Sequence, residues 1–334
     1  MSGNNKVYTS DRHTYRCGFN DHYHHQQELD EFNEGDNLPH VSVIVCSHRY
    51  DCQVESLLCI LSRQLLVKLQ LVLVTDEQIL VDVPDNVVCL VNEGIGLSCA
   101  RNTGIKHACG DYIAFIDDDA KPHTRIWLRT LVYMCDKLGA DVIGGPVIPH
   151  TCVDIPTYLM WVIGCTVPGF DRPIGCNMLF KSYVFRQHNF RFKSTLGKHA
   201  QVSKTRVSKT CTGNTCTYET CGNYVSEETD LFNRMRQAGF KVVTVEQGSV
   251  IHMVKPHRLT WRYLINRSIV EGRSKYHAGT GTSESRVVHM ILKQPSLKGL
   301  VALACAAYGY LYEHVYVHTR ENKGEGETRW YVKS

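Results

Sequence analysis

The sequence lacks any pair of cysteines spaced as C-x-x-C, although it contains 15 cysteines. That spacing is typical of redox motifs and of tightly paired zinc ligands, so neither is indicated. Cys46, Cys59 and Cys89 lie within apolar runs, where a reduced thiol behaves as a small hydrophobic side chain. We therefore expect free thiols.

Long hydrophobic runs are also missing. Residues 1–40 contain no apolar segment of the kind that a secretory signal needs, so we expect a cytoplasmic protein. The most apolar run, residues 299–312, carries no charge. It is shorter than the about 20 residues that a membrane-spanning helix requires.

A strong excess of one charge is missing as well. The 37 Lys and Arg against 33 Asp and Glu give a formal net charge of +4, too little for a protein that neutralises a nucleic-acid backbone. We expect no nucleic-acid partner. With 334 residues, 43% of them hydrophobic, the chain can bury a core of one large domain, with room for a smaller extension.

Three segments are polar enough to predict mobile chain. They are the tail at 1–38, a Thr-, Lys- and Ser-rich insertion at 193–223 and the tail at 321–334. Histidines in the first tail could bind a metal, but a solvated tail is favoured because no second ligand group accompanies them. Those histidines are His22, His24 and His25.

The predicted insertion contains a possible zinc site. Cys211, Cys216 and Cys221 are separated by equal gaps, and His199 could serve as a fourth ligand. Zinc loops normally use closer pairs of ligands, so free thiols are the favoured interpretation.

Apolar stretches rich in β-branched residues alternate with helical patterns along the first half of the chain. This alternation predicts an α/β domain with a mostly parallel sheet, whose ligands bind at the carboxyl ends of its strands. Strands are expected at 41–47, 69–75, 86–91, 111–117, 140–145, 241–246 and 249–254, and helices at 54–66, 97–108, 124–138, 226–237 and 258–275.

Three adjacent carboxylates end one predicted strand. Along an extended strand, Asp117 and Asp119 project to one side and Asp118 to the other. Two oxygens on one side can approach one Mg²⁺ or Mn²⁺ while leaving positions open for a diphosphate. An acidic turn before the next helix is the alternative, and the hydrophobic strand favours the metal site.

Two further sequence patterns each allow more than one interpretation. Gly94 and Gly96 lie between a strand and a helix, but Cys99 replaces the third glycine of a dinucleotide-binding loop, so an NAD- or FAD-dependent oxidoreductase is only an alternative. Ser226 is a suitable helix N-cap, and Glu227 and Glu228 then fall in the first turn. These acids could stabilise the helix or perform chemistry.

Together, these segments resemble the family 2 inverting glycosyltransferases of GT-A fold, over about residues 41–275. The most specific stretch is ARNTGIKHACGDYIAFIDDDAKP at 100–122. The resemblance implies a GT-A type, mostly parallel sheet flanked by helices, with a nucleotide-sugar half at 39–145 and an acceptor half at 146–255. Segments with the same order as in the family are 41–51, 72–76, 92–122, 174–180, 226–240 and 250–254.

The resemblance also implies roles for individual residues. Glu228 matches the catalytic base, with Glu227 as its alternative. Asp117 and Asp119 match the ligands of a Mg²⁺ or Mn²⁺ ion, and His252 is either a further contact to the metal or diphosphate or an ordinary strand-end histidine. Gly175 and Asn177 match the acceptor side. The residues matched to donor nucleotide binding are Ser47, His48, Asp76, Arg101, Asn102 and Asp118.

The implied function is a metal-dependent, inverting hexosyl- or hexuronosyltransferase. Its donor would be a nucleotide sugar, most commonly a UDP-sugar in this family, and its acceptor a hydroxyl of a lipid-linked glycan or a polysaccharide. A single displacement needs one base and no covalent nucleophile. A non-catalytic module that binds nucleotides or carbohydrates is the other alternative. Such a module would not need an acidic residue at position 228.

Residues 256–320 are predicted to form a basic and apolar helical extension. Cations such as Arg267 and Lys298 precede the apolar run, which ends in Tyr308, Tyr310 and Tyr312. This combination favours peripheral attachment to the cytoplasmic face of an anionic membrane over a helix packed on the sheet. A membrane location would imply a lipid-linked acceptor, as in the archaeal dolichol-phosphate-linked glycan assembly enzymes of the family.

Overall fold

The computed structural model describes residues 38–79, 83–151, 153–197, 225–279 and 282–322. The expected tails, most of the predicted insertion, and the histidine and zinc candidates lie outside these residues. The cysteines within them are free thiols, as expected.

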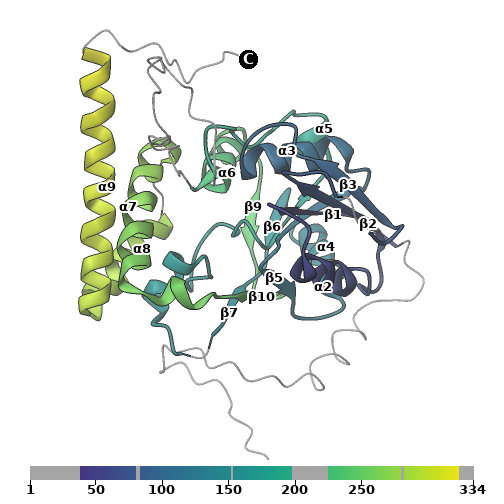
Figure 1. Ribbon diagram of the computed structural model, residues 1–334, viewed down its shortest axis with the longest axis horizontal. Coiled ribbons are helices and arrows are strands. Elements are labelled where there is room, and N and C mark those ends of the chain that lie inside the picture. The colour runs from purple at the N-terminus through teal and green to yellow at the C-terminus, as the bar shows by residue number, and fades with distance from the viewer. Residues whose placement is uncertain (1–37, 80–82, 152, 198–224, 280–281, 323–334) are drawn as a thin grey trace, which may run out of the picture.

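A central sheet of seven strands confirms the predicted α/β class (Figure 1). Its strand order is β3-β2-β1-β4-β8-β6-β9. All neighbouring pairs are parallel except the two made by β8, which runs antiparallel to β4 and β6. The strands are β1 (His40–Ser47), β2 (Lys68–Thr75), β3 (Val87–Val91), β4 (Tyr112–Asp117), β6 (Val142–Gly144), β8 (Met178–Lys181) and β9 (Val242–Thr244).

Helices cover both faces of this sheet. Successive residues of β1 face opposite sides, so Val43 and Val45 join one buried cluster and Ile44 the other. Figure 1 shows α3, α5 and α6 on one side and α2 and α4 on the other. These helices are α2 (Cys52–Leu61), α3 (Leu97–His107), α4 (Trp127–Lys137), α5 (Tyr183–Arg186) and α6 (Glu227–Gln237).

The strand β8 corrects one expectation. Residues 175–179 were expected, from the family resemblance, to form an acceptor-side loop, whereas Met178–Lys181 is a strand between β4 and β6. Its residue Leu179 is fully buried. Met178–Phe180 is a short apolar run, and periodicity alone does not distinguish a buried strand from a buried helical segment in such a run.

A second, three-stranded sheet was not predicted. It has the order β5-β10-β7, and β10 lies within the strand expected at 249–254. The pairing of β10 with β5 places His252 opposite Ala120, the residue that directly follows the three acids Asp117–Asp119. The strands are β5 (Ala120–Pro122), β7 (Val147–His150) and β10 (Val250–Met253).

Helices follow the second sheet, as expected for residues 256–320, although the domain boundaries themselves stay a prediction. Figure 1 shows α9 as the outermost of these helices, alongside α7. Across the described residues, no helix has both the length and the apolar character needed to cross a bilayer. The elements are η2 (Pro256–Leu259), α7 (Trp261–Ala278), α8 (Thr282–Lys293) and α9 (Leu297–Asn322), with η1 (Thr157–Ile163) from the preceding half.

The apolar run 299–312 has two different faces within α9. One face contacts α7 so closely that a Cβ on Gly272 would lie 1.9 Å from the carbonyl oxygen of Ala306. The other face exposes large apolar side chains in a stripe with helical spacing. We call this stripe the α9 outer face, and it comprises Leu300, Tyr308, Leu311, Tyr312 and Val315.

Close packing of α7 against α9 predicts the effect of one substitution. A Cβ on Gly309 would lie 2.2 Å from the backbone oxygen of Ile269, so Gly309→Leu should lower the free energy of unfolding by about 1–3 kcal/mol. Ala304→Leu adds side-chain volume at an exposed position of the same helix and is the matched control. Urea denaturation measures both variants. Equal losses in the two would contradict this packing.

Candidate active site

Most residues predicted for catalysis and metal binding line one cavity of about 100 Å³. It lies where β4 ends and α6 begins. The two acidic segments, distant in the sequence, therefore face a common space. The predicted residues that line the cavity are Arg101, Asp117, Asp119, Gly175, Glu227, Glu228 and His252.

Arg101 is the buried centre of this site, with 2% of its surface exposed. Its Nη1 lies 2.7 Å from Oε1 of Glu227, and its Nη2 lies 3.2 Å from Oδ1 of Asp117. Burial alone would lower the pKa of Arg101, but the charges of Glu227 and Asp117 outweigh burial and raise it. The guanidinium is therefore a permanent cation between the ends of β4 and α6.

Glu227 and Glu228 differ in their surroundings. Glu227 is 5% exposed, and its carboxylate is bound by Arg101. Glu228 borders both this cavity and a larger neighbouring one. Burial and the charge of Glu227 raise the pKa of Glu228 to about 7, while Arg101 opposes the shift. The Glu228 carboxylate can therefore exchange a proton near neutral pH.

Ser226 precedes α6 but does not cap it through its side chain, contrary to the expectation. Its φ of 71° is in the left-handed region, which a non-glycine residue rarely occupies. Its hydroxyl donates to Oε2 of Glu271, at 3.2 Å, instead of accepting from the first helical turn. This turn directs the first residues of α6 into the cavity.

Asp119 and His252 meet across the second sheet, 3.3 Å apart between Oδ1 and Nε2. Arg258, from η2, lies against both residues. Its Nη2 is 2.7 Å from Oδ2 of Asp119, and its Nη1 donates to Nε2 of His252 at 2.9 Å. A guanidinium therefore neutralises Asp119 in this structure.

Whether these residues suit a divalent ion can be judged from their donor atoms. Within the part of the chain that the structure describes, no three His, Cys, Asp or Glu side chains form a ready-made metal site. Asp117 and Asp119 offer two carboxylates facing one cavity. Mg²⁺ is commonly held by one or two carboxylates together with substrate phosphates and water. The donor set fits such a shared site.

Four of the predicted nucleotide residues form a polar edge beside the cavity, at the carboxyl ends of β1, β2 and β4. The Ser47 hydroxyl donates to Oδ2 of Asp118 at 2.6 Å. Nδ1 of His48 lies 2.7 Å from Oδ2 of Asp76, whose Oδ1 accepts from Asn92 at 2.9 Å. The His48 side chain is 79% exposed, so a ligand could reach this edge.

Two predicted residues instead brace the backbone. Asn102 donates to the carbonyl oxygen of Phe192 at 2.8 Å and accepts from its amide at 3.0 Å. Asn177 is fully buried, accepts from the Trp127 indole at 3.0 Å and donates to the carbonyl oxygen of Gly248 at 2.9 Å. Neither is among the residues that line the cavity.

Sequence reasoning missed several residues at this site. Gln53 donates to the backbone oxygen of Asp118 at 2.7 Å. Arg258 belongs to a basic segment, but nothing in its local pattern indicated a contact with Asp119. Three charged residues of the larger cavity were also missed, and they are Arg172, Glu271 and Glu284.

Comparison with known proteins agrees with this geometry. Residues 42–198 match the family model Glycosyl transferase family 2. The chain carries a glycosyltransferase family 2 domain. This match decides against the oxidoreductase alternative, and the chain is a glycosyltransferase.

Two relatives from Haloferax volcanii are similar in sequence. Glucosyl-dolichyl phosphate glucuronosyltransferase is 27% identical over 263 residues, which cover 70% of this chain and 76% of that protein. Glycosyltransferase AglE is 41% identical over 64 residues, 19% of this chain and 21% of that protein.

One solved structure supports the fold. The mannosyltransferase PcManGT from Pyrobaculum calidifontis, in complex with GDP-Man and Mn²⁺, aligns with a TM-score of 0.50 at 15% identity. The alignment covers 87% of this chain and 82% of PcManGT. It confirms the expected GT-A type fold of the glycosyltransferase.

The buried pair of Arg101 and Glu227 predicts a large loss of stability when one partner is removed. Glu227→Ala should lower the free energy of unfolding by about 3–5 kcal/mol, because Arg101 is left as a buried charge with less compensation. The matched variant is Glu93→Ala, whose pair with Lys106 has side chains 47% and 53% exposed. It should cost at most about 1 kcal/mol. Urea denaturation that gave equal losses would contradict the role of the buried pair.

Proposed function

We propose that this glycosyltransferase moves a sugar from a nucleotide sugar to a hydroxyl of a lipid-linked acceptor, with a divalent ion and with inversion at the anomeric carbon. One observation carries the proposal: Asp117, Asp119 and Glu228 line the same cavity. Ligands for a divalent ion that would compensate the charge of a leaving diphosphate, and a base for an incoming hydroxyl, are thus available in one space.

The donor is assigned to the polar edge and the adjoining part of the cavity. His48 and Asp76 offer exposed hydrogen-bonding groups for a nucleobase, while Ser47 and Asp118 offer them for a ribose. The resemblance to the family makes a UDP-sugar the first donor to test. PcManGT, whose structure contains GDP-Man, supports a nucleotide sugar as the donor class.

Asp117 and Asp119 would hold a Mg²⁺ or Mn²⁺ ion, with His252 as a possible further ligand. Such an ion, when bound, stabilises the charge of the departing diphosphate. Arg258 contacts both Asp119 and His252, so it must share these groups with the ion or release them. The Mn²⁺ in the PcManGT complex supports a metal of this class.

Glu228 is the proposed catalytic base. A carboxylate whose pKa is near 7 can take the proton from a hydroxyl as its oxygen attacks the anomeric carbon. Glu227 has a positioning role, because its ion pair with Arg101 holds the start of α6. A single attack from the side opposite the leaving group inverts the anomeric centre and requires no enzyme nucleophile.

Two observations support a lipid-linked acceptor at the cytoplasmic face of a membrane. The α9 outer face exposes apolar and tyrosine side chains, a composition suited to the interface of a bilayer, and the preceding helices are rich in cations. The relative at 27% identity is a glucosyl-dolichyl phosphate glucuronosyltransferase, which favours a polyprenyl-type phosphate and a hexuronosyl or hexosyl donor.

The role of Glu228 predicts both a mutational and a pH effect. Glu228→Gln should lower kcat by about 10²–10⁴-fold, because an amide cannot accept the proton. With the native chain, kcat/KM should rise about tenfold per pH unit up to about pH 7 and then level off, since the carboxylate must be ionised. Release of nucleoside diphosphate measures both. A rate independent of pH between 5 and 9 would contradict this assignment.

A binding control separates the base from the metal ligands. Thermal shifts with nucleoside diphosphates and Mn²⁺ should be unchanged in Glu228→Gln, since ligands that bind the folded state raise its stability. In Asp117→Ala/Asp119→Ala the part of the shift that depends on Mn²⁺ should disappear. If the double variant kept this part, the metal would not be bound at Asp117 and Asp119.

The α9 outer face predicts attachment to membranes. The chain should float with liposomes of anionic lipid, and Leu300→Glu/Leu311→Glu should weaken attachment by about tenfold or more for each leucine removed. The matched control is Val88→Glu/Val91→Glu, which adds the same charge at exposed positions of the edge strand β3. Equal flotation of the two double variants would contradict attachment through α9.

A further inference from the structure

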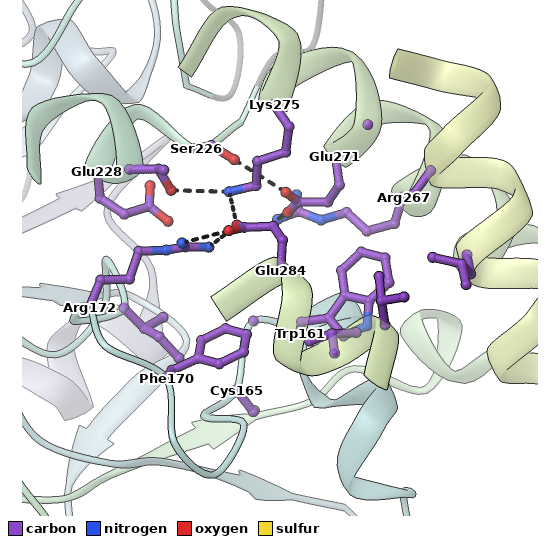
Figure 2. Close-up of a pocket in the computed structure, with 18 of the residues that line it drawn as sticks. Trp161, Cys165, Phe170, Arg172, Ser226, Glu228, Arg267, Glu271, Lys275 and Glu284 are labelled. Atoms are coloured by element: carbon purple, nitrogen blue, oxygen red, sulfur yellow. Dashed lines mark hydrogen bonds and ion pairs between the residues drawn. The ribbon is translucent and has the colours of Figure 1, made fainter. Parts of the chain in front are cut away.

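A second cavity, of about 180 Å³, adjoins the proposed active site (Figure 2). Its walls come from η1, α6, α7, α8, α9 and the segment 170–174. Both cavities share five lining residues, among them the proposed base. The shared residues are Gly164, Ile174, Ser226, Glu228 and Arg267.

Three cations and three carboxylates lie in the upper part of this cavity, as Figure 2 shows, and the third carboxylate is that of Glu228. Nη2 of Arg172 is 2.5 Å from Oε1 of Glu284, and Nζ of Lys275 is 3.1 Å from the same oxygen. Nη2 of Arg267 is 2.6 Å from Oε1 of Glu271. The carboxylate of Glu284 thus serves two of the three cations, Arg172 and Lys275.

The cavity wall also contains two hydrogen-bond donors without acceptors. Within the described part of the chain, neither Nε of Arg267 nor Nε1 of Trp161 has a hydrogen-bond partner, although both atoms are buried. Buried donors are almost always paired. An anion bound beside Arg267 would supply the acceptor that its Nε lacks.

The lower part of the cavity is apolar. Phe170 lies there (Figure 2), and apolar side chains of α8 and α9 also line the cavity, among them Val288, Ile291 and Leu303. The opposite side of α9 carries the outer face, which is proposed to attach to the membrane. The cavity therefore joins a cationic group to an apolar wall next to the helix expected at the bilayer.

We propose that this second cavity binds the phosphate that links the acceptor sugar to its lipid, through Arg172, Arg267 and Lys275. The α8 and α9 side chains contact the first part of the lipid chain. The inference rests on the proposed function, since it places the acceptor on the side of Glu228 that faces away from Asp117 and Asp119. The hydroxyl to be glycosylated then lies at the boundary between the two cavities.

Binding of dodecyl phosphate, measured by isothermal titration calorimetry below its critical micelle concentration, tests this site. Arg172→Gln should weaken binding about tenfold by removing a charge-assisted contact, whereas Glu284→Gln should strengthen it by removing a competing carboxylate. These opposite effects would not arise from dodecyl chains attaching to the α9 outer face. Lys68→Gln, which removes an exposed cation of β2, should change nothing.

Two further ligands identify what the cavity recognises. Dodecyl glucoside has the chain without the phosphate, and inorganic phosphate lacks the chain, so both should bind more weakly than dodecyl phosphate. Equal affinity for inorganic phosphate would overturn the lipid assignment. Unchanged dodecyl phosphate affinity in Glu284→Gln would overturn the phosphate assignment, even if Arg172→Gln did not fold.

The assay needs neither donor nor transfer, so its outcome is separate from that of the proposed function. If nucleotide with Mn²⁺ shifts the melting temperature but dodecyl phosphate fails to bind, only the acceptor site is wrong. If dodecyl phosphate binds as expected but no nucleotide binds, the assignment of the second cavity is supported and the donor assignment is wrong.

Discussion

The site depends on the buried guanidinium of Arg101. A buried charge is tolerated only where partners compensate it, and this one is bound by Asp117 at the end of β4 and Glu227 at the start of α6. Gly175 lets the backbone approach, since a Cβ there would lie 2.9 Å from Nη2 of Arg101. One side chain thereby fixes the donor side of the cavity relative to the proposed base.

Two adjacent residues of α3 have different structural roles. Neighbours along a helix point in different directions, so Arg101 faces the cavity while Asn102 holds the backbone at Phe192. Family resemblance assigned both to the nucleotide pocket. The structure gives Asn102 a bracing contact, which a motif match cannot distinguish from a contact with substrate.

The two cavities suggest how donor and acceptor are kept apart. Glu228 lies where they meet. Asp117 and Asp119 lie on one side of it, and a wall that contains cations and apolar side chains lies on the other. An inverting displacement needs this arrangement, because the attacking oxygen and the leaving diphosphate occupy opposite sides of the anomeric carbon. The helices that form the second cavity are the same ones that expose the apolar face of α9.

The sequence by itself determined the strands β1, β2 and β4, the helices packed on them and the acids at their ends. Those features are local, since each follows from alternating or continuous apolar residues and the polar residues that end them. The strand β8 and the pairing of β10 with β5 and β7 were decided by tertiary structure, because the pattern of a short strand does not indicate which distant segments become its neighbours. Tertiary structure also decided the contact of Arg258 with Asp119 and that of Arg172 with Glu284. In each pair the two residues lie far apart in the chain and become neighbours only when the helices pack.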